Sequence, residues 1–211
     1  MTGPTLSQVR RGGLLGIAAG LVGAAVTVLS QFATPTVPPD QTSYPWVPAM
    51  FVLLGLLMTA VRVGFVVLIA ALSMSGVSGR GGTARTGLIL ALVGFAVQAL
   101  AQFLLLFATG SRADDAYPSA IALLAAIATA VGGLGLVLAG VGALRTTDWL
   151  GWRRFTPLAA GVVTTAMVAT AFSGDVRNWG MLLWCCVLAI LGAALATQPR
   201  AYTSRSSIPQ R

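Results

Sequence analysis

The chain has 211 residues, of which 56% are hydrophobic and only 9% are charged, and its mean hydropathy is +0.86. A soluble domain carries about a quarter charged residues. A chain this apolar could not cover its own surface with polar groups, so we exclude the class of soluble domains and take the lipid bilayer as its solvent.

The residue types present also limit the chemistry. All thirteen basic residues are Arg and all five acidic residues are Asp. Because His, Glu and Lys are absent, the commonest general acids, bases and metal ligands are missing, and Arg stays protonated. We therefore expect no enzyme, no cofactor and no metal site. The adjacent Cys185 and Cys186 are expected to be small buried hydrophobic residues.

Five apolar runs meet or approach the length that crosses the hydrocarbon layer of a bilayer, roughly 20 residues. A sixth, residues 157–172, is shorter but is also predicted to be a span, because its flanks carry charge. In chain order the six runs are residues 14–32, 47–74, 87–108, 119–144, 157–172 and 179–196. Only helices satisfy their backbone groups without water, so the sequence predicts an all-α, polytopic transmembrane bundle of six helices. Residues 13–197 form this domain, between a cytoplasmic N-terminus, residues 1–12, and a disordered cytoplasmic tail, residues 198–211.

The charged residues of the connecting segments are segregated between the two sides of the predicted bundle. Cytoplasmic segments of membrane proteins carry an excess of basic residues, so we predict that both termini lie in the cytoplasm, with the bundle in a bacterial plasma membrane. The net charge of +8 then reflects topology and attraction to anionic lipid headgroups, not nucleic-acid binding. The predicted cytoplasmic segments hold Arg10, Arg11, Arg80, Arg85, Arg145, Arg153, Arg154, Arg200, Arg205 and Arg211, and the opposite segments hold Arg112 and Arg177.

Aromatic residues flank the predicted spans, as a belt at the membrane interfaces requires. The outer interface is expected to hold Tyr44, Trp46, Tyr117 and Trp179, and the inner interface Trp149, Trp152 and Phe155. Segment 148–155 fits either a short interfacial turn or a plain connecting loop.

A faint repeat relates three outer turns, residues 40–46, 114–118 and 175–179, and likewise three helix starts on the inner side, residues 11–16, 85–90 and 154–159. Three helical hairpins would explain it. Topology alone, which demands Arg on one side and aromatic residues at the interfaces, explains it equally well, and we favour topology.

Small residues recur every three or four positions in two of the predicted helices. Such stripes let helices approach closely in a membrane, where association rests on packing between small residues. We therefore predict that the first and fourth helices are tightly packed central elements. The stripes are Gly13, Gly16, Gly20, Gly23, Thr27 and Ser30, and Ala125, Ala128, Gly132, Gly135, Ala139 and Gly142.

One arginine, Arg62, lies in the middle of the second predicted span. A charge at the bilayer centre costs about 2.5–3.5 kcal/mol on insertion scales, and Arg needs hydrogen-bond acceptors. Thr59 shares its helix face, and Gln98 and Gln102 share a face of the third helix, so a polar seam of these four residues is predicted. Either the seam satisfies Arg62 and locks the packing, which we favour, or Arg62 faces a pocket and attracts an anionic ligand. The remaining alternative is a helix broken near Gly64, which would place Arg62 close to an interface.

The longest outer loop, residues 33–48, contains five prolines that stiffen it. It could cover the bundle as a lid or meet a partner. We favour a simpler role, in which it is a stiff ramp that leads the chain back into the membrane.

The arginine pair at the start, the proline-rich first outer loop with DQTSYPWVP and the chain length resemble small uncharacterised six-helix membrane proteins of high-GC Gram-positive bacteria. This resemblance implies a source and a topology, not a mechanism. The sequence is most consistent with a non-enzymatic accessory or structural membrane component. The alternative is a small transporter or channel with an anion-attracting pocket at Arg62. A second copy of the chain and another membrane protein are left open as partners.

Overall fold

The computed structural model describes residues 6–79, 81–146, 149, 151–170 and 174–197, and at residues 170 and 174–177 it describes the backbone alone. The predictions for the tail, for Arg80 and Asp148, and for the side chain of Arg177 lie outside this part. The described elements are the helices α1 (Leu6–Gln31), α2 (Pro48–Ser75), α3 (Gly82–Leu105), α4 (Ala116–Arg145), α5 (Thr156–Thr170) and α6 (Gly174–Ala196), with short 3-10 helices at Leu106–Ala108 and Gly151–Phe155.

The predicted fold class is confirmed: the six long elements are all α-helices, and the described residues form no strand. Five of the helices, all except α5, are long and apolar enough to cross a membrane. The fifth predicted span is a helix of 15 residues, about 22 Å long. Helix α1 begins at Leu6, inside the segment expected to precede the bundle.

The boundaries of α2 follow from its terminal residues. Pro48 lies in the first turn, where its missing N–H costs no helical hydrogen bond. Gly76 ends the helix in the left-handed conformation, with φ of 70°, which glycine adopts without steric cost. Between these ends α2 continues without a break through Arg62.

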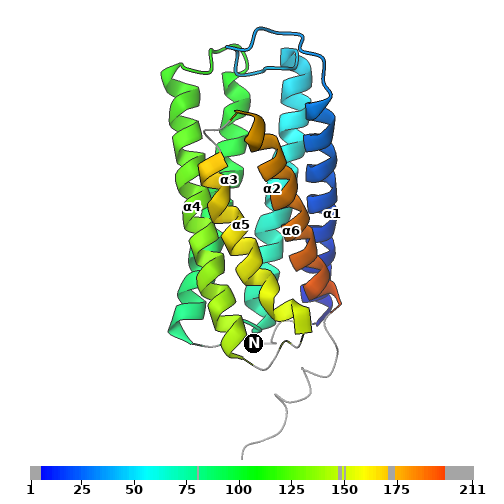
Figure 1. Ribbon diagram of the computed structural model, residues 1–211, viewed down its shortest axis with the longest axis vertical. Helices are drawn as coiled ribbons and strands as arrows, with labels where there is room; N and C mark the ends of the chain where they lie inside the picture. The colour runs from blue at the N-terminus through cyan, green and yellow to red at the C-terminus, as the bar shows by residue number, and fades with distance from the viewer. Residues whose placement is uncertain (1–5, 80, 147–148, 150, 171–173, 198–211) are drawn as a thin grey trace, which may run out of the picture.

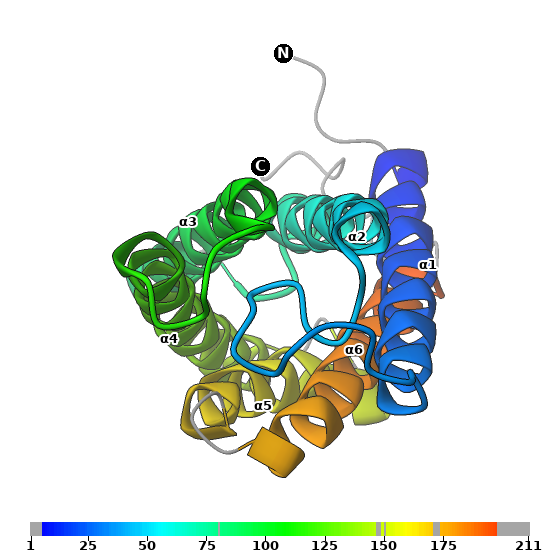
Figure 2. The same cartoon turned by 90° about the horizontal axis from the view of Figure 1, so that it is seen from above.

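The helices stand side by side in a ring (Figures 1 and 2). Each helix packs on the next in sequence, and α6 closes the ring on α1. The prediction that the first and fourth helices are central is therefore wrong, because α1 lies between α2 and α6 and α4 lies between α3 and α5. Their glycines serve close pairwise contacts instead: a Cβ at Gly20 would lie 2.7 Å from the carbonyl oxygen of Cys185 on α6.

The two ends of the ring differ. Leu6 and Thr197, the first and last described residues, lie at one end (Figure 1), which we call the terminal end. The opposite, distal end carries the loop of residues 32–47 between α1 and α2 and the loop of residues 109–115 between α3 and α4. Which end faces the cytoplasm stays a prediction.

The largest side chains of the core are unevenly distributed between the two ends of the ring. Among the described residues, the largest fully buried side chains lie at the level of Trp184 or between it and the terminal end: Trp184, Phe65, Leu68, Ile69, Leu72, Val77, Leu136, Trp149, Thr164, Leu188, Leu191 and Leu195. Toward the distal end, the fully buried residues of the described part are small, Ser43, Ala101 and Ala108, while the larger Leu106 and Ile121 are buried but 7% and 6% exposed. The terminal half of the ring is therefore closed by side chains.

Two expectations about burial are wrong. Trp149 was expected at the inner interface, but it is buried in the core, where its large apolar surface fills the terminal end of the ring. Cys185 is buried as expected, whereas Cys186 is exposed, because adjacent helical residues point about 100° apart. Trp152 and Phe155, by contrast, are exposed on the 3-10 helix Gly151–Phe155.

Candidate functional site

Arg62 lies at mid-height in the bundle. It is separated from Pro48 and Ser75, the ends of α2, by about 20 Å in each direction. In the six helices it is the only charged residue more than two turns from a helix end. A cation at this depth needs interactions within the protein or with a ligand.

The guanidinium of Arg62 contacts two other helices. Its Nε donates a hydrogen bond of 3.2 Å to Oε1 of Gln102 on α3. Its Cζ lies 5.5 Å from the centroid of the Trp184 ring on α6, within the distance at which a cation is attracted to an aromatic face. Arg62 therefore links α2 to α3 and α6.

One nitrogen of the same group is left over. Nη1 of Arg62 has almost no accessible surface and meets no hydrogen-bond acceptor among the described residues, although the residue as a whole is half-buried. A buried donor without an acceptor costs about 1–3 kcal/mol, and more when it is charged. The ion pairs of the described residues all belong to Arg112, at the distal end, so no described carboxylate neutralises Arg62.

Trp184, Phe65 and Phe95 form a layer of aromatic rings across the bundle. This layer lies next to Arg62, on its terminal side. Its ring meets Phe65 of α2 edge to face at 5.0 Å and stacks with Phe95 of α3 at 6.1 Å. Its Nε1 donates a hydrogen bond of 3.0 Å to Thr164 Oγ1 of α5. Together with the filled terminal half, this layer closes the side of Arg62 that faces the terminal end.

The four predicted seam residues do not form one network. The structure brings Arg62 and Gln102 together. Gln98 donates from Nε2 to Thr129 Oγ1 of α4 at 2.6 Å instead. The hydroxyl of Thr59 donates to the carbonyl oxygen of Gly55 in its own helix at 2.8 Å, the usual local bond of a helical threonine.

Sequence reasoning missed Trp184, Thr129 and Thr164. A buried indole N–H usually has a hydrogen-bond partner, so a tryptophan within an apolar span was a usable signal. The partner itself, Thr164, lies on a different helix, at a sequence separation of 20. No spacing rule within one helix could have identified it.

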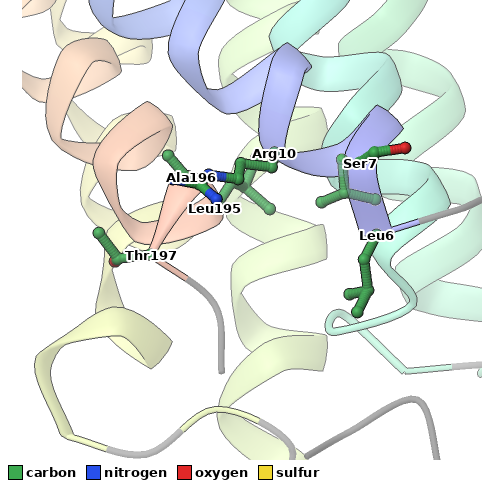
Figure 3. A pocket seen from close by; sticks show the side chains of 7 residues that line it. Leu6, Ser7, Arg10, Leu195, Ala196 and Thr197 are labelled. Carbon is green, nitrogen blue, oxygen red and sulfur yellow. The ribbon is translucent and has the colours of Figure 1, made fainter. Parts of the chain in front are cut away.

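A pocket lies at the terminal end, between the start of α1 and the end of α6 (Figure 3). It has a volume of about 390 Å³ and is lined by Leu6, Ser7, Val9, Arg10, Leu195, Ala196 and Thr197. It contains none of the predicted site residues. Among the described residues, no three His, Cys, Asp or Glu side chains gather in a way that could hold a metal ion.

Comparisons with protein-family models, with curated proteins and with solved structures found no match to this chain. The site must therefore be interpreted from its own geometry.

Proposed function

We propose that this protein is a non-enzymatic membrane component that binds a monovalent anion at Arg62. The observation that carries the proposal is the buried Nη1 of Arg62, which has no acceptor in the described part of the chain. An anion would accept its hydrogen bond and neutralise the guanidinium charge, and both interactions are strong at low dielectric. Arg62 is the only charged residue more than two turns from an end of the six helices. A single positive charge at this depth favours an anion with a single charge.

The distal half of the ring is the side from which the anion would enter. In the described part, the large fully buried side chains lie at the level of Trp184 or toward the terminal end. The layer of Trp184, Phe65 and Phe95 separates Arg62 from that end. Since α2 is unbroken at Arg62, and discontinuous helices are typical of transport sites, we propose binding rather than conduction.

The test is the thermal stability of the purified protein in detergent micelles with chloride, nitrate or iodide, compared with gluconate at constant ionic strength. A ligand that binds only the folded state stabilises it by about 2.7 kcal/mol at a concentration of 100 Kd. We expect a saturable rise of the Tm for the native protein, a smaller one for Arg62→Lys and none for Arg62→Leu. Arg85→Leu removes an exposed arginine near the start of α3 and is the matched control, which should respond like the native protein.

A second candidate function, in which Arg62 only locks the packing, is favoured by its hydrogen bond to Gln102 and its position over Trp184. It agrees with an accessory or structural role for the whole protein. In that case Arg62→Leu lowers the Tm, but the Tm of the native protein does not depend on the anion. That result would contradict the binding proposal.

A further inference from the structure

The loop of residues 32–47, here called the strap, is longer than is needed to join α1 to α2. Helices α1 and α2 are neighbours in the ring, and antiparallel neighbours are usually joined by about 2–8 residues. The strap uses 16 residues, the number between Gln31 and Pro48. Loops of this length are uncommon in compact domains and are usually either functional or disordered linkers, and the hydrogen bonds below show that the strap is ordered.

The extra length carries the strap over the distal end of the ring. Figure 2 shows it lying over the centre of the ring, and Figure 1 shows it at the distal end. From there it returns to α2, so the strap lies across the end of the ring that is farther from the layer at Trp184. The simpler expectation of a ramp into the membrane does not account for this path.

The strap is fastened to the loop of residues 109–115. Gln41 and Arg112 form an antiparallel bridge. Thr42 donates from its backbone N and from Oγ1 to the carbonyl oxygen of Ser111, at 3.1 and 3.0 Å. Ala113 N donates to the carbonyl oxygen of Asp40 at 2.7 Å.

An ion pair reinforces these hydrogen bonds. Arg112 Nη2 lies 3.3 Å from Asp40 Oδ2 of the strap, and Arg112 Nε lies 3.4 Å from Asp114 Oδ1 of its own loop. All three side chains are largely exposed. Exposed pairs are weak and are screened by salt, so this fastening can open without unfolding the bundle.

Within the strap, local hydrogen bonds keep it a defined unit. Thr36 donates from N and Oγ1 to the carbonyl oxygen of Pro45, each at 2.9 Å, and Trp46 N donates to Ser43 O at 2.8 Å. Ser43 is fully buried, and its Oγ has no partner among the described residues. Because the strap has its own internal hydrogen bonds and its ion pair with Arg112 is exposed, it can move as one piece.

We infer that the strap is a gate at the distal end of the ring, held shut by its contacts with Ser111, Arg112 and Ala113, and that it regulates the access of anions to Arg62. This inference rests on the proposed anion site. It predicts that the fastening sets the rate of entry and leaves the site itself unchanged.

The experiment uses a reporter cysteine at the site and a reversible lock on the strap. Arg62→Cys is made in a chain with Cys185→Ala and Cys186→Ala, and Gln41→Cys with Arg112→Cys adds the lock. Opposed residues of an antiparallel bridge have Cα atoms about 4.5–5.5 Å apart, which suits a disulfide. Thr59→Cys, less than one turn from Arg62 toward the distal end, is a second reporter in case the first does not fold.

The rate of reaction with a small, charged thiol reagent is measured in micelles, where both ends meet water. The oxidised lock should slow labelling of the reporter at least tenfold, and reduction of the lock before labelling should restore it. Without the lock, Asp40→Asn should speed labelling about two- to fivefold, as the loss of an exposed ion pair allows. Asp114→Asn, which removes a carboxylate outside the strap, should have less effect.

Two results would overturn the gate in different ways. Equal labelling rates in the oxidised and reduced lock would show that entry does not pass the strap, and the anion site would stand. If neither reporter is labelled in any state, Arg62 has no aqueous path, and the proposed function fails together with the gate.

Discussion

Trp184 of α6 donates a hydrogen bond of 3.0 Å from its indole Nε1 to Thr164 Oγ1 of α5, and both residues are about 1% exposed. Thr164 Oγ1 in turn donates to the carbonyl oxygen of Ala160 at 2.6 Å. The hydroxyl therefore accepts from one helix and donates within its own, and it holds the indole in position beside Arg62.

Thr164→Val should lower the free energy of unfolding in micelles by about 1 kcal/mol, because it removes the acceptor and leaves the indole N–H unsatisfied. Thr165→Val is the matched control, since Thr165 donates only locally, to the carbonyl oxygen of Gly161. Equal losses for the two variants in a denaturant titration would contradict the role of the Trp184 bond.

The pair of Arg62 and Gln102 should be coupled in a double-mutant cycle. Gln102→Leu leaves Nε of Arg62 without its acceptor, so it should cost about 1–3 kcal/mol when Arg62 is present and much less in the Arg62→Leu background. The measurement is the free energy of unfolding of the four proteins in the cycle. Additive losses would show that the 3.2 Å bond contributes nothing to stability.

Gln98 should couple to Thr129 and not to Arg62. Its amide donates to Thr129 Oγ1, so the losses caused by Gln98→Leu and Arg62→Leu should add within about 0.5 kcal/mol. The losses caused by Gln98→Leu and Thr129→Val should be less than additive. The same unfolding assay checks both cycles, and a strong coupling of Gln98 to Arg62 would support the single polar seam.

Gly87→Ala should separate α3 from α4. A Cβ at this position would lie 2.7 Å from the backbone N of Ala139 and from the carbonyl oxygen of Gly135, and crowding of this kind costs about 1–3 kcal/mol. In the same helix, a Cβ at Gly82 meets nothing within 4 Å, so Gly82→Ala should be neutral or stabilising. A native Tm in Gly87→Ala would contradict the close packing of the two helices.

The two cysteines should report which residues face lipid. In membranes, a lipid-soluble thiol reagent should label the exposed Cys186 much faster than the buried Cys185, and a membrane-impermeant reagent should label neither. Mass spectrometry of Cys185→Ala and Cys186→Ala variants separates the two signals. Rapid labelling of Cys186 by the impermeant reagent would place that face of α6 in water.

The fold class was predictable because hydropathy and helix length depend on local sequence alone. The arrangement of the helices was not, since a small-residue stripe shows that a face is closely packed but does not identify the neighbour that it meets. The glycines of α1 meet α6 and α2, and no feature of their spacing distinguishes this edge of a ring from a central position.

The predicted seam failed at Gln98 for a geometric reason. Four residues turn a helix by about 400°, so Gln102 is rotated by about 40° from Gln98 on α3. In a ring, α2 and α4 lie on opposite sides of α3, and this rotation is enough for Gln98 to reach α4 while Gln102 reaches α2. Residues on one face of a helix can therefore belong to different interfaces.

The contact between α1 and α6 has a consequence for biogenesis. Chains are synthesised from the N-terminus, so α1 is made before α6. Positions such as Gly13 and Gly20, which fit against the backbone of α6, have no counterpart until α6 has been synthesised. Helix α1 therefore lacks one of its two neighbours until α6 has been made. A chain truncated before α6 would leave the ring open beside α1.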